Sequence, residues 1–245
     1  SIDSKKIKYG LSRTRALLHA CHHPEKKLLS IQIVGTNGKG STAAMLANVF
    51  INNNYKTGLF TSPHLVSLNE RIRINHKNIS DSFIEEFLSE YKEEIRSIEP
   101  SFFEIMTVLS LYYFAKKKVD IAILETGLGG ALDSVTAAEA KSIIFTPIDY
   151  DHMSILGNSL EQIAIEKGGS ICNKNQILIS CTQHDKVKKN LNKMAETKKN
   201  IISYQSKKIE NLPLLSIEHQ NDNAQLVIFA LKYIQLAYKL NCQNI

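Results

Sequence analysis

Short apolar runs alternate with segments of helical periodicity along most of the sequence, and this alternation restricts the fold more than any other feature. The predicted strands cover 31–34, 56–60, 119–124, 142–147, 176–180 and 200–204, and the predicted helices cover 41–54, 81–94, 102–117, 159–167, 185–198 and 222–240. Strands that alternate with helices through short connections favour a mostly parallel sheet with helices on both faces. The sequence therefore predicts an α/β fold whose ligands bind beyond the carboxyl ends of the strands.

Composition excludes several other classes. The 245 residues, 43% of them apolar, suffice for one large domain with a sizeable core. The net charge of +6 comes from lysines in short scattered runs, unlike the concentrated charge of a nucleic-acid binder, and indicates only attraction for an anionic substrate. We find no secretory signal, no run of about 18–20 apolar residues that could span a membrane, and no metal-binding spacing among the cysteines. We expect a cytoplasmic protein with no nucleic-acid or membrane partner.

A glycine-rich loop follows the strand at 31–34 and opens the next helix. Its sequence is Gly35-Thr36-Asn37-Gly38-Lys39-Gly40-Ser41-Thr42. Backbone N–H groups at such a strand-to-helix turn face an anion, and a lysine adds positive charge. The lysine precedes the last glycine instead of following it, so the usual P-loop expression fails although the physical argument holds. The loop predicts a phosphate-binding cradle in which Lys39 neutralises the β and γ phosphates.

Two further polar residues follow predicted strands. Glu125 comes directly after the strand at 119–124, where a carboxylate is costly unless a cation pairs with it, and carboxylate oxygens suit Mg²⁺. His152 lies in the loop after the next strand. A single histidine in a loop usually binds no metal, so position alone supports Glu125 as a metal ligand better than it supports His152.

Several short motifs in a fixed order resemble one family. They are the loop at 35–42, Thr61-Ser62-Pro63-His64-Leu65, Asn69-Glu70-Arg71-Ile72-Arg73, Phe103-Glu104, Leu124-Glu125-Thr126-Gly127-Leu128-Gly129-Gly130, Asp151-His152, Glu166-Lys167-Gly168, His219-Gln220 and Asn223-Ala224. Their order and spacing resemble the folylpolyglutamate synthase/dihydrofolate synthase branch of the Mur ligase superfamily from about residue 8 to 240. The resemblance implies a P-loop-containing Mur-ligase-type central domain.

That resemblance also implies a reaction. ATP, with Mg²⁺, would phosphorylate the carboxylate of a folate or dihydropteroate, and the amine of L-glutamate would attack the acyl phosphate to form an amide. The implied partners are these small-molecule substrates, and the implied oligomeric state is a monomer. The family's site residues carry over as catalytic groups Lys39, Glu125, His152 and Lys167, and as the nucleotide-binding loop 35–42 with Asn223 against adenine. The metal ligands carry over as Ser62, Glu125, His152 and a carbamylated Lys167, and the substrate contacts as Phe103 and Asp133.

The chain departs from the family pattern beside this site. The usual Gly-Gly-Arg-Leu-Asp-Ala-Thr-Asn has become 129–136 with Ala131 in place of arginine and Thr136 in place of asparagine. We expect residues 1–245 to form one ATP-binding domain, and the smaller C-terminal domain that supplies much of the family's glutamate site to be absent. Two alternatives stay open, namely a Mur-type ligase with another carboxylate substrate and a non-catalytic ATP-binding fragment.

Overall fold

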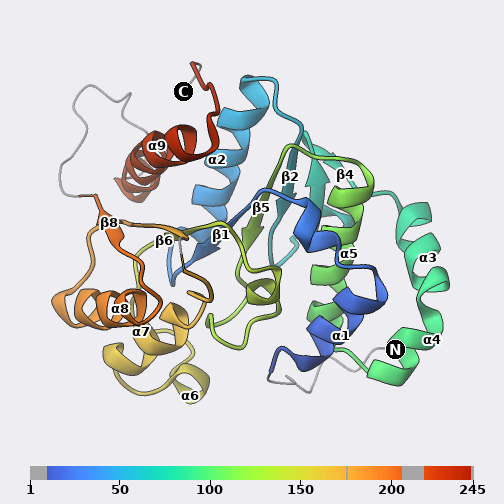
Figure 1. Cartoon of the computed structure of the whole chain (residues 1–245), viewed down its shortest axis with the longest axis horizontal. Helices are drawn as coiled ribbons and strands as arrows, with labels where there is room; N and C mark the ends of the chain where they lie inside the picture. Colours follow the sequence, from blue (N-terminus) through green and yellow to red (C-terminus); the bar gives the residue numbers. More distant parts are fainter. Residues whose placement is uncertain (1–9, 175, 206–217, 244–245) are drawn as a thin grey trace.

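A central sheet organises the molecule, which is known from a computed structural model that describes residues 10–174, 176–205 and 218–243 (Figure 1). Within these ranges the sheet has eight strands in the order β4-β3-β2-β5-β1-β6-β7-β8. Six strands form parallel pairs, whereas β3 is antiparallel to both β2 and β4. The strands are β1 (Ser30–Val34), β2 (Thr57–Phe60), β3 (Ile72–Ile74), β4 (Lys77–Asn78), β5 (Ile121–Glu125), β6 (Ser142–Phe145), β7 (Ile177–Ser180) and β8 (Ile202–Tyr204). The predicted mostly parallel sheet is confirmed.

Helices cover both faces of this sheet, as the alternation predicted. The α-helices are α1 (Ser12–Ala20), α2 (Lys39–Asn52), α3 (Asp81–Glu90), α4 (Lys92–Ile98), α5 (Phe102–Lys116), α6 (Met153–Leu156), α7 (Leu160–Gly168), α8 (Asp185–Thr197) and α9 (Glu218–Tyr238). Short 3₁₀ helices are η1 (Pro24–Lys27), η2 (Leu68–Arg71) and η3 (Ser134–Ala138). None of the helices in the described ranges is long and apolar enough to cross a membrane.

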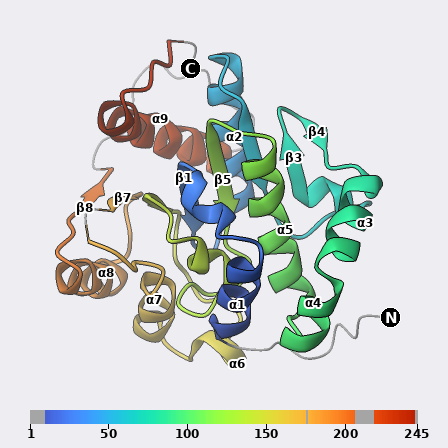
Figure 2. The same cartoon turned by 45° about the vertical axis from the view of Figure 1, so that its right-hand side comes forward.

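The alternation of side chains along β1 divides the core. Ile31 and Ile33 are buried on the face covered by α2 and α9, where apolar residues from both helices pack. Val34 packs on the opposite face with residues of α7 and α8. Farther along that face, α1 and α5 pack over β2, β3 and β5, and Figure 2 shows α1 beside α5. The result is a three-layer α/β domain.

Strand order brings three strand ends together. β1 lies between β5 and β6, and all three run in the same direction. Because β2 to β5 lie on one side of β1 and β6 to β8 lie on the other, the chain changes direction across the sheet at β1. Ligands bind at such a switch point, at the carboxyl ends of the strands. The glycine-rich loop after β1, Glu125 in β5 and the loop after β6 meet at that edge.

The structure adds elements that the periodicity did not predict. Helix α1 and the hairpin β3–β4 were not predicted, and the hairpin turns through Asn75 and His76, both with positive φ (45° and 67°). The predicted helix 81–94 is divided at Tyr91, whose φ of −104° and ψ of 24° separate α3 from α4. The loop suggested at 207–216 lies outside the described residues.

Candidate functional site

Two lysines from distant segments meet at the first carbonyl of the glycine-rich loop. Lys39 Nζ donates hydrogen bonds to Gly35 O (3.1 Å) and Thr36 O (3.2 Å). Lys167 Nζ, from α7, donates to the same Gly35 O at 2.7 Å. Two ammonium groups that share one carbonyl make this end of the loop strongly attractive to an anion. The structure thus brings the predicted Lys39 and Lys167 together.

The loop presents fewer backbone donors than its sequence predicted. The N–H groups of Thr36 and Asn37 both donate to Pro147 O (2.9 and 3.3 Å), which fixes the loop to the segment after β6. Thr42 is buried and its N–H donates to Gly38 O, so it continues the helix. The expectation that the whole loop faces the anion is therefore wrong for the N–H groups of these three residues. The donors that remain for a ligand are at the first turn of α2, where N–H groups have no acceptor within the helix.

Helix α9 packs against the other side of the loop. Gly38 has a φ of +79°, and a Cβ added there would lie 2.3 Å from Asn223 Oδ1, so glycine is required both by backbone conformation and by space. Gln220 Nε2 donates to Ser41 Oγ at 3.2 Å. The predicted nucleotide contact Asn223 is therefore adjacent to the phosphate loop. Gln220, which was seen only as part of a motif, holds the start of α2 directly.

Glu125 lies beneath the start of α2. Its Oε2 accepts a hydrogen bond from Ser62 N at 3.0 Å, and a Cβ on Gly40 would lie 3.4 Å from Oε1. Burial raises the pKa of the Glu125 carboxyl, whereas the Ser62 N–H and the Lys39 charge lower it. A buried carboxylate next to Ser62 and the phosphate loop offers the hard oxygen donor that suits Mg²⁺. The predicted pair Ser62 and Glu125 is brought together.

Lys167 is almost completely buried, with 1% of its surface exposed. Burial in the first place, and the nearby Lys39 charge in the second, lower the pKa of its amine to about 8. The carboxylates of Asp151, Asp133 and Glu166 act in the opposite direction. Lys167 is therefore not the ordinary exposed lysine that its sequence neighbours would allow. A desolvated amine with a lowered pKa is partly neutral near physiological pH, which is the form that can react with CO₂.

The position of His152 gives weaker support for its predicted role as a metal ligand. It adopts the left-handed backbone conformation before α6, its side chain is 56% exposed, and its Nε2 lies 3.4 Å from Asp151 Oδ1. Asp151 in turn acts on the Lys167 charge, so His152 lies at the rim of the same region. Within the described ranges no three His, Cys, Asp or Glu side chains gather as a metal site would require. A second metal at His152 thus stays a prediction.

The predicted substrate contacts, Phe103 and Asp133, share one wall. The Phe103 ring packs on Gly127, where an added Cβ would lie 2.5 Å from Cζ, and it neighbours Phe60 at a centroid distance of 5.8 Å. Asp133 Oδ2 accepts from Leu128 N at 2.8 Å and Oδ1 from Val135 N at 2.9 Å. Burial raises the pKa of Asp133 to about 6, against its backbone donors, which lower it. Asp133 organises the loop after β5, a role that the sequence did not reveal.

The two departures in this loop have structural partners. Thr136 Oγ1 donates to Gly130 O at 2.7 Å and accepts from Gln32 Nε2 at 3.0 Å, so it ties the loop to β1. Ala131 N donates to Glu166 O at 2.8 Å, and a Cβ on Gly169 would lie 2.4 Å from the Ala131 Cβ. The segments after β5 and at the end of α7 approach closely because both carry small residues. This contact holds Lys167 against the phosphate loop.

An open, mostly parallel sheet with a glycine-rich loop at its switch point and a buried carboxylate beside it defines a phosphate-binding α/β domain. Comparison with protein families matches residues 33–243 to the Mur ligase middle domain. The chain belongs to this family.

Individual relatives show which members of this family the chain resembles. The dihydrofolate synthase/folylpolyglutamate synthase of Bacillus subtilis is 41% identical over 184 residues, which cover 72% of this chain and 43% of the relative. The folylpolyglutamate synthase of Mycobacterium tuberculosis, solved with ADP and AMPPCP, superimposes with a TM-score of 0.85 at 27% identity over 92% of this chain and 59% of that chain. Escherichia coli FolC, solved in complex with DHPP and ADP, gives 0.87 at 28% identity over 100% and 61%. The chain spans about half the length of the curated relatives that it matches, 43% and 55% in two cases.

Proposed function

We propose that this chain binds Mg·ATP and carries the phosphorylating site of a ligase that joins L-glutamate to a dihydropteroate or folate carboxylate. The names of the relatives and the ADP in two related structures support this proposal. The proposed partners are accordingly small molecules, and we expect a monomer in the cytoplasm.

The observation that carries the proposal is the pair of lysines at the Gly35 carbonyl. In the structure Lys39 and Lys167 both donate to this oxygen. Phosphate oxygens carry negative charge, so an ammonium group is attracted to them by a charge–charge interaction that a neutral carbonyl lacks. Lys39 would therefore leave the carbonyls for the β and γ phosphates. Such a transfer needs no rearrangement of the loop, since the lysine already lies at its centre.

The opposite wall would hold Mg²⁺. Glu125 and Ser62 would supply a carboxylate and a hydroxyl group, and because burial raises the pKa of the Glu125 carboxyl, a bound cation would stabilise its ionised form. When bound, the metal would screen the charge between the γ-phosphate and the substrate carboxylate. Glu125 and Ser62 would orient it, and Lys39 would act on the phosphate from the other side.

For the remaining substrate, the protein would mainly position groups. Phe103 and the loop that Asp133 organises would hold the aromatic part, so that the carboxylate faces the γ-phosphate. The carboxylate oxygen then attacks phosphorus, ADP leaves, and the amine of L-glutamate displaces phosphate from the acyl phosphate to give an amide. Positioning and charge stabilisation are sufficient for such a reaction. Asn223 would contact adenine, and His152 with a carbamate of Lys167 would complete a second metal site.

Two measurements test the proposal. Calorimetry with Mg·ADP and Mg·ATP should give saturable binding, and the absence of binding at millimolar nucleotide would reject the nucleotide site. Incorporation of radiolabelled glutamate into dihydropteroate or tetrahydrofolate, by this chain and by any longer native form, tests the ligase. Nucleotide binding without incorporation in either form would favour a non-catalytic binding fragment. Incorporation with a different carboxylate acceptor would favour another Mur-type ligase.

A further inference from the structure

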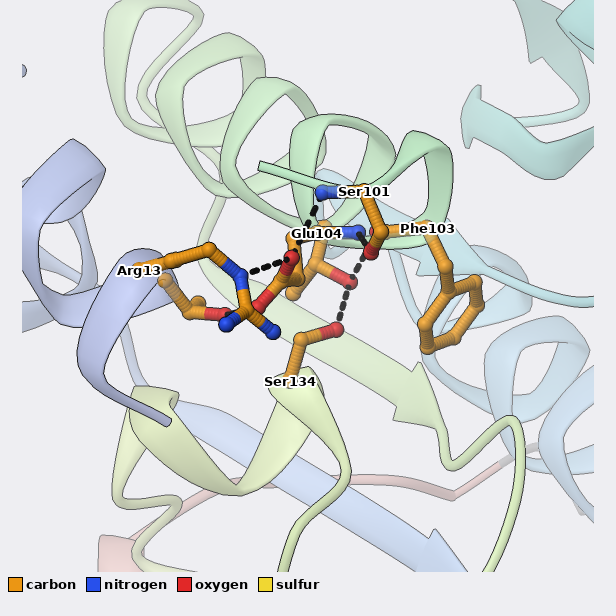
Figure 3. Close-up of polar contacts among 7 residues, drawn as sticks. Arg13, Ser101, Phe103, Glu104 and Ser134 are labelled. Atoms are coloured by element: carbon orange, nitrogen blue, oxygen red, sulfur yellow. Dashed lines mark hydrogen bonds and ion pairs between the residues drawn. The ribbon is translucent and has the colours of Figure 1, made fainter. Parts of the chain in front are cut away.

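A buried carboxylate joins the first helix of the described chain to the wall of the candidate substrate site. Glu104 lies in the first turn of α5, and only 5% of its side chain is exposed. Its Oε2 accepts hydrogen bonds from Arg13 Nε of α1 at 3.1 Å and from Ser101 N at 2.6 Å. Its Oε1 lies 3.5 Å from Thr14 Oγ1. Figure 3 shows Arg13 and Glu104 facing each other across the two helices.

Helix capping alone does not account for this arrangement. Ser101 and Glu104 form a reciprocal capping box, in which Glu104 N donates to Ser101 Oγ at 3.3 Å. A capping box stabilises a helix equally well at the surface, where its carboxylate keeps its water. Burying the carboxylate adds a desolvation cost that the Arg13 charge must offset. The position of a second part of the structure therefore depends on the Arg13–Glu104 pair.

The group that it fixes is the turn that carries Phe103. Phe103 directly precedes Glu104, and its carbonyl accepts a hydrogen bond from Thr107 Oγ1 at 2.9 Å. The Thr107 hydroxyl also lies 2.7 Å from Ser134 Oγ. Figure 3 shows the dashed contact at Ser134 and the Phe103 ring pointing away from the Arg13–Glu104 pair. The turn is thus held on one side by α1 and on the other by η3.

The contacts then close into a circuit. Ser134 follows Asp133, whose carboxylate accepts from Leu128 N and Val135 N and so shapes the loop after β5. Gly127 in that loop is the surface on which the Phe103 ring packs. Rotating the first turn of α5 would therefore move the ring relative to the loop. The position of the Phe103 ring therefore depends on Glu104 and Arg13, whose contact prevents this rotation.

We infer that Glu104, held by Arg13, is a positioning residue that sets the Phe103 ring against Gly127 and thereby determines affinity for the aromatic part of the carboxylate substrate. The identity of that substrate rests on the proposed function, whereas the position of the ring does not. Glu104 itself touches no reacting atom. Its effect passes through the backbone of the α5 first turn to the ring.

The experiment measures the ring position first and binding second. The chain contains nine phenylalanines, so labelling with 4-fluorophenylalanine and comparison with Phe103→Leu identifies the ¹⁹F resonance of Phe103. Glu104→Gln and Arg13→Ala should both shift this resonance, and Arg13→Lys should restore much of it. The matched control is Glu86→Gln, which breaks the exposed Glu86–Lys116 ion pair at the far end of the same helix and should leave the resonance unchanged.

Binding measurements then distinguish a specific effect on the position of Phe103 from a general loss of structure. In Glu104→Gln and Arg13→Ala the Kd for dihydropteroate, measured by calorimetry in Mg·ADP, should rise about tenfold, the loss expected from one charge-assisted hydrogen bond. The Kd for Mg·ADP should not change. If wild type binds Mg·ADP but not dihydropteroate, the proposed substrate is wrong, and the ¹⁹F shift alone decides the role of Glu104.

Three results would overturn the inference. One is an unmoved Phe103 resonance in both variants, and another is equal weakening of dihydropteroate and Mg·ADP binding. The third is an unchanged dihydropteroate Kd despite a shifted resonance. If Glu104→Gln does not fold, Arg13→Lys still gives the comparison with wild type, because it keeps a positive charge beside the Glu104 carboxylate.

Discussion

Replacing Lys167 with methionine removes a buried amine and should raise the free energy of unfolding at neutral pH. The pKa of this amine is lowered from 10.5 to about 8. At about 1.36 kcal/mol for each pKa unit, the folded state bears a cost of about 3 kcal/mol whenever the amine is protonated. Methionine also loses the hydrogen bond to Gly35 O, which is worth about 1 kcal/mol. The expected net gain at pH 7 is about 2 kcal/mol.

The sign of the pH dependence follows from the protons bound by each state. Below pH 8 the amine is protonated in both the folded and the unfolded chain, so the cost is constant. Between about pH 8 and 10.5 the unfolded chain keeps a proton that the folded chain has lost, and stability therefore rises with pH. The advantage of Lys167→Met should accordingly shrink across this interval and reverse above it, where only the loss of the hydrogen bond to Gly35 O remains and makes the variant about 1 kcal/mol less stable.

Urea unfolding at pH 7, 8, 9 and 10 measures both effects. Buffers without bicarbonate and with a chelator keep the amine unmodified and free of metal. The matched control is Lys186→Met, since Lys186 is an exposed lysine paired with Glu161, and its loss should change stability by about 1 kcal/mol or less. A variant that is less stable than wild type at pH 7, or a difference that does not change between pH 8 and 10, would refute the burial argument.

Further substitutions test other parts of the site. Lys39→Ala should weaken Mg·ADP binding at least about tenfold, measured by calorimetry, with an unchanged circular dichroism spectrum. Glu125→Gln should reduce the dependence of nucleotide affinity on Mg²⁺, and an unchanged Mg²⁺ titration would contradict the metal assignment. Gly127→Ala places a Cβ against the Phe103 ring and should lower the free energy of unfolding by about 1–3 kcal/mol in urea. ¹³C-bicarbonate at pH 8 should give a carbamate resonance that Lys167→Met lacks; equal spectra would exclude carbamylation.

Local chemistry explains which parts of the site the sequence predicted. The glycine-rich loop is a continuous segment whose strand and helix neighbours are visible in the sequence, so its place at the end of β1 needed no tertiary information. Glu125 at a strand end could be predicted for the same reason. The contact of Lys167 with Gly35 joins residues 132 positions apart. Only the family resemblance, and no periodicity, directed attention to this lysine.

Other features were missed because their local signals are weak. The β3–β4 turn has positive φ at Asn75 and His76, where the usual signal is glycine. Strand β3 has only three residues, too few for alternation to be recognised. The substrate contact of Asp133 stays a prediction, but the backbone N–H groups that its oxygens accept could not be predicted, because tertiary contacts with Thr107 and Gln32 set the path of the loop around it. Sequence indicated the type of residue but not its partner.

The central position of β1 has a consequence for folding during translation. Strand β1 has no neighbouring strand close in sequence, since Ser30 pairs with Ala122 and Ile31 with Ser142. At about 5–20 residues per second, roughly 5–20 s of translation separate the emergence of β1 from that of its first partner. All five residues of β1 are buried in the finished sheet. During that interval Ile31, Ile33 and Val34 lack the strands that flank them in the finished sheet, and both edges of β1 stay unpaired.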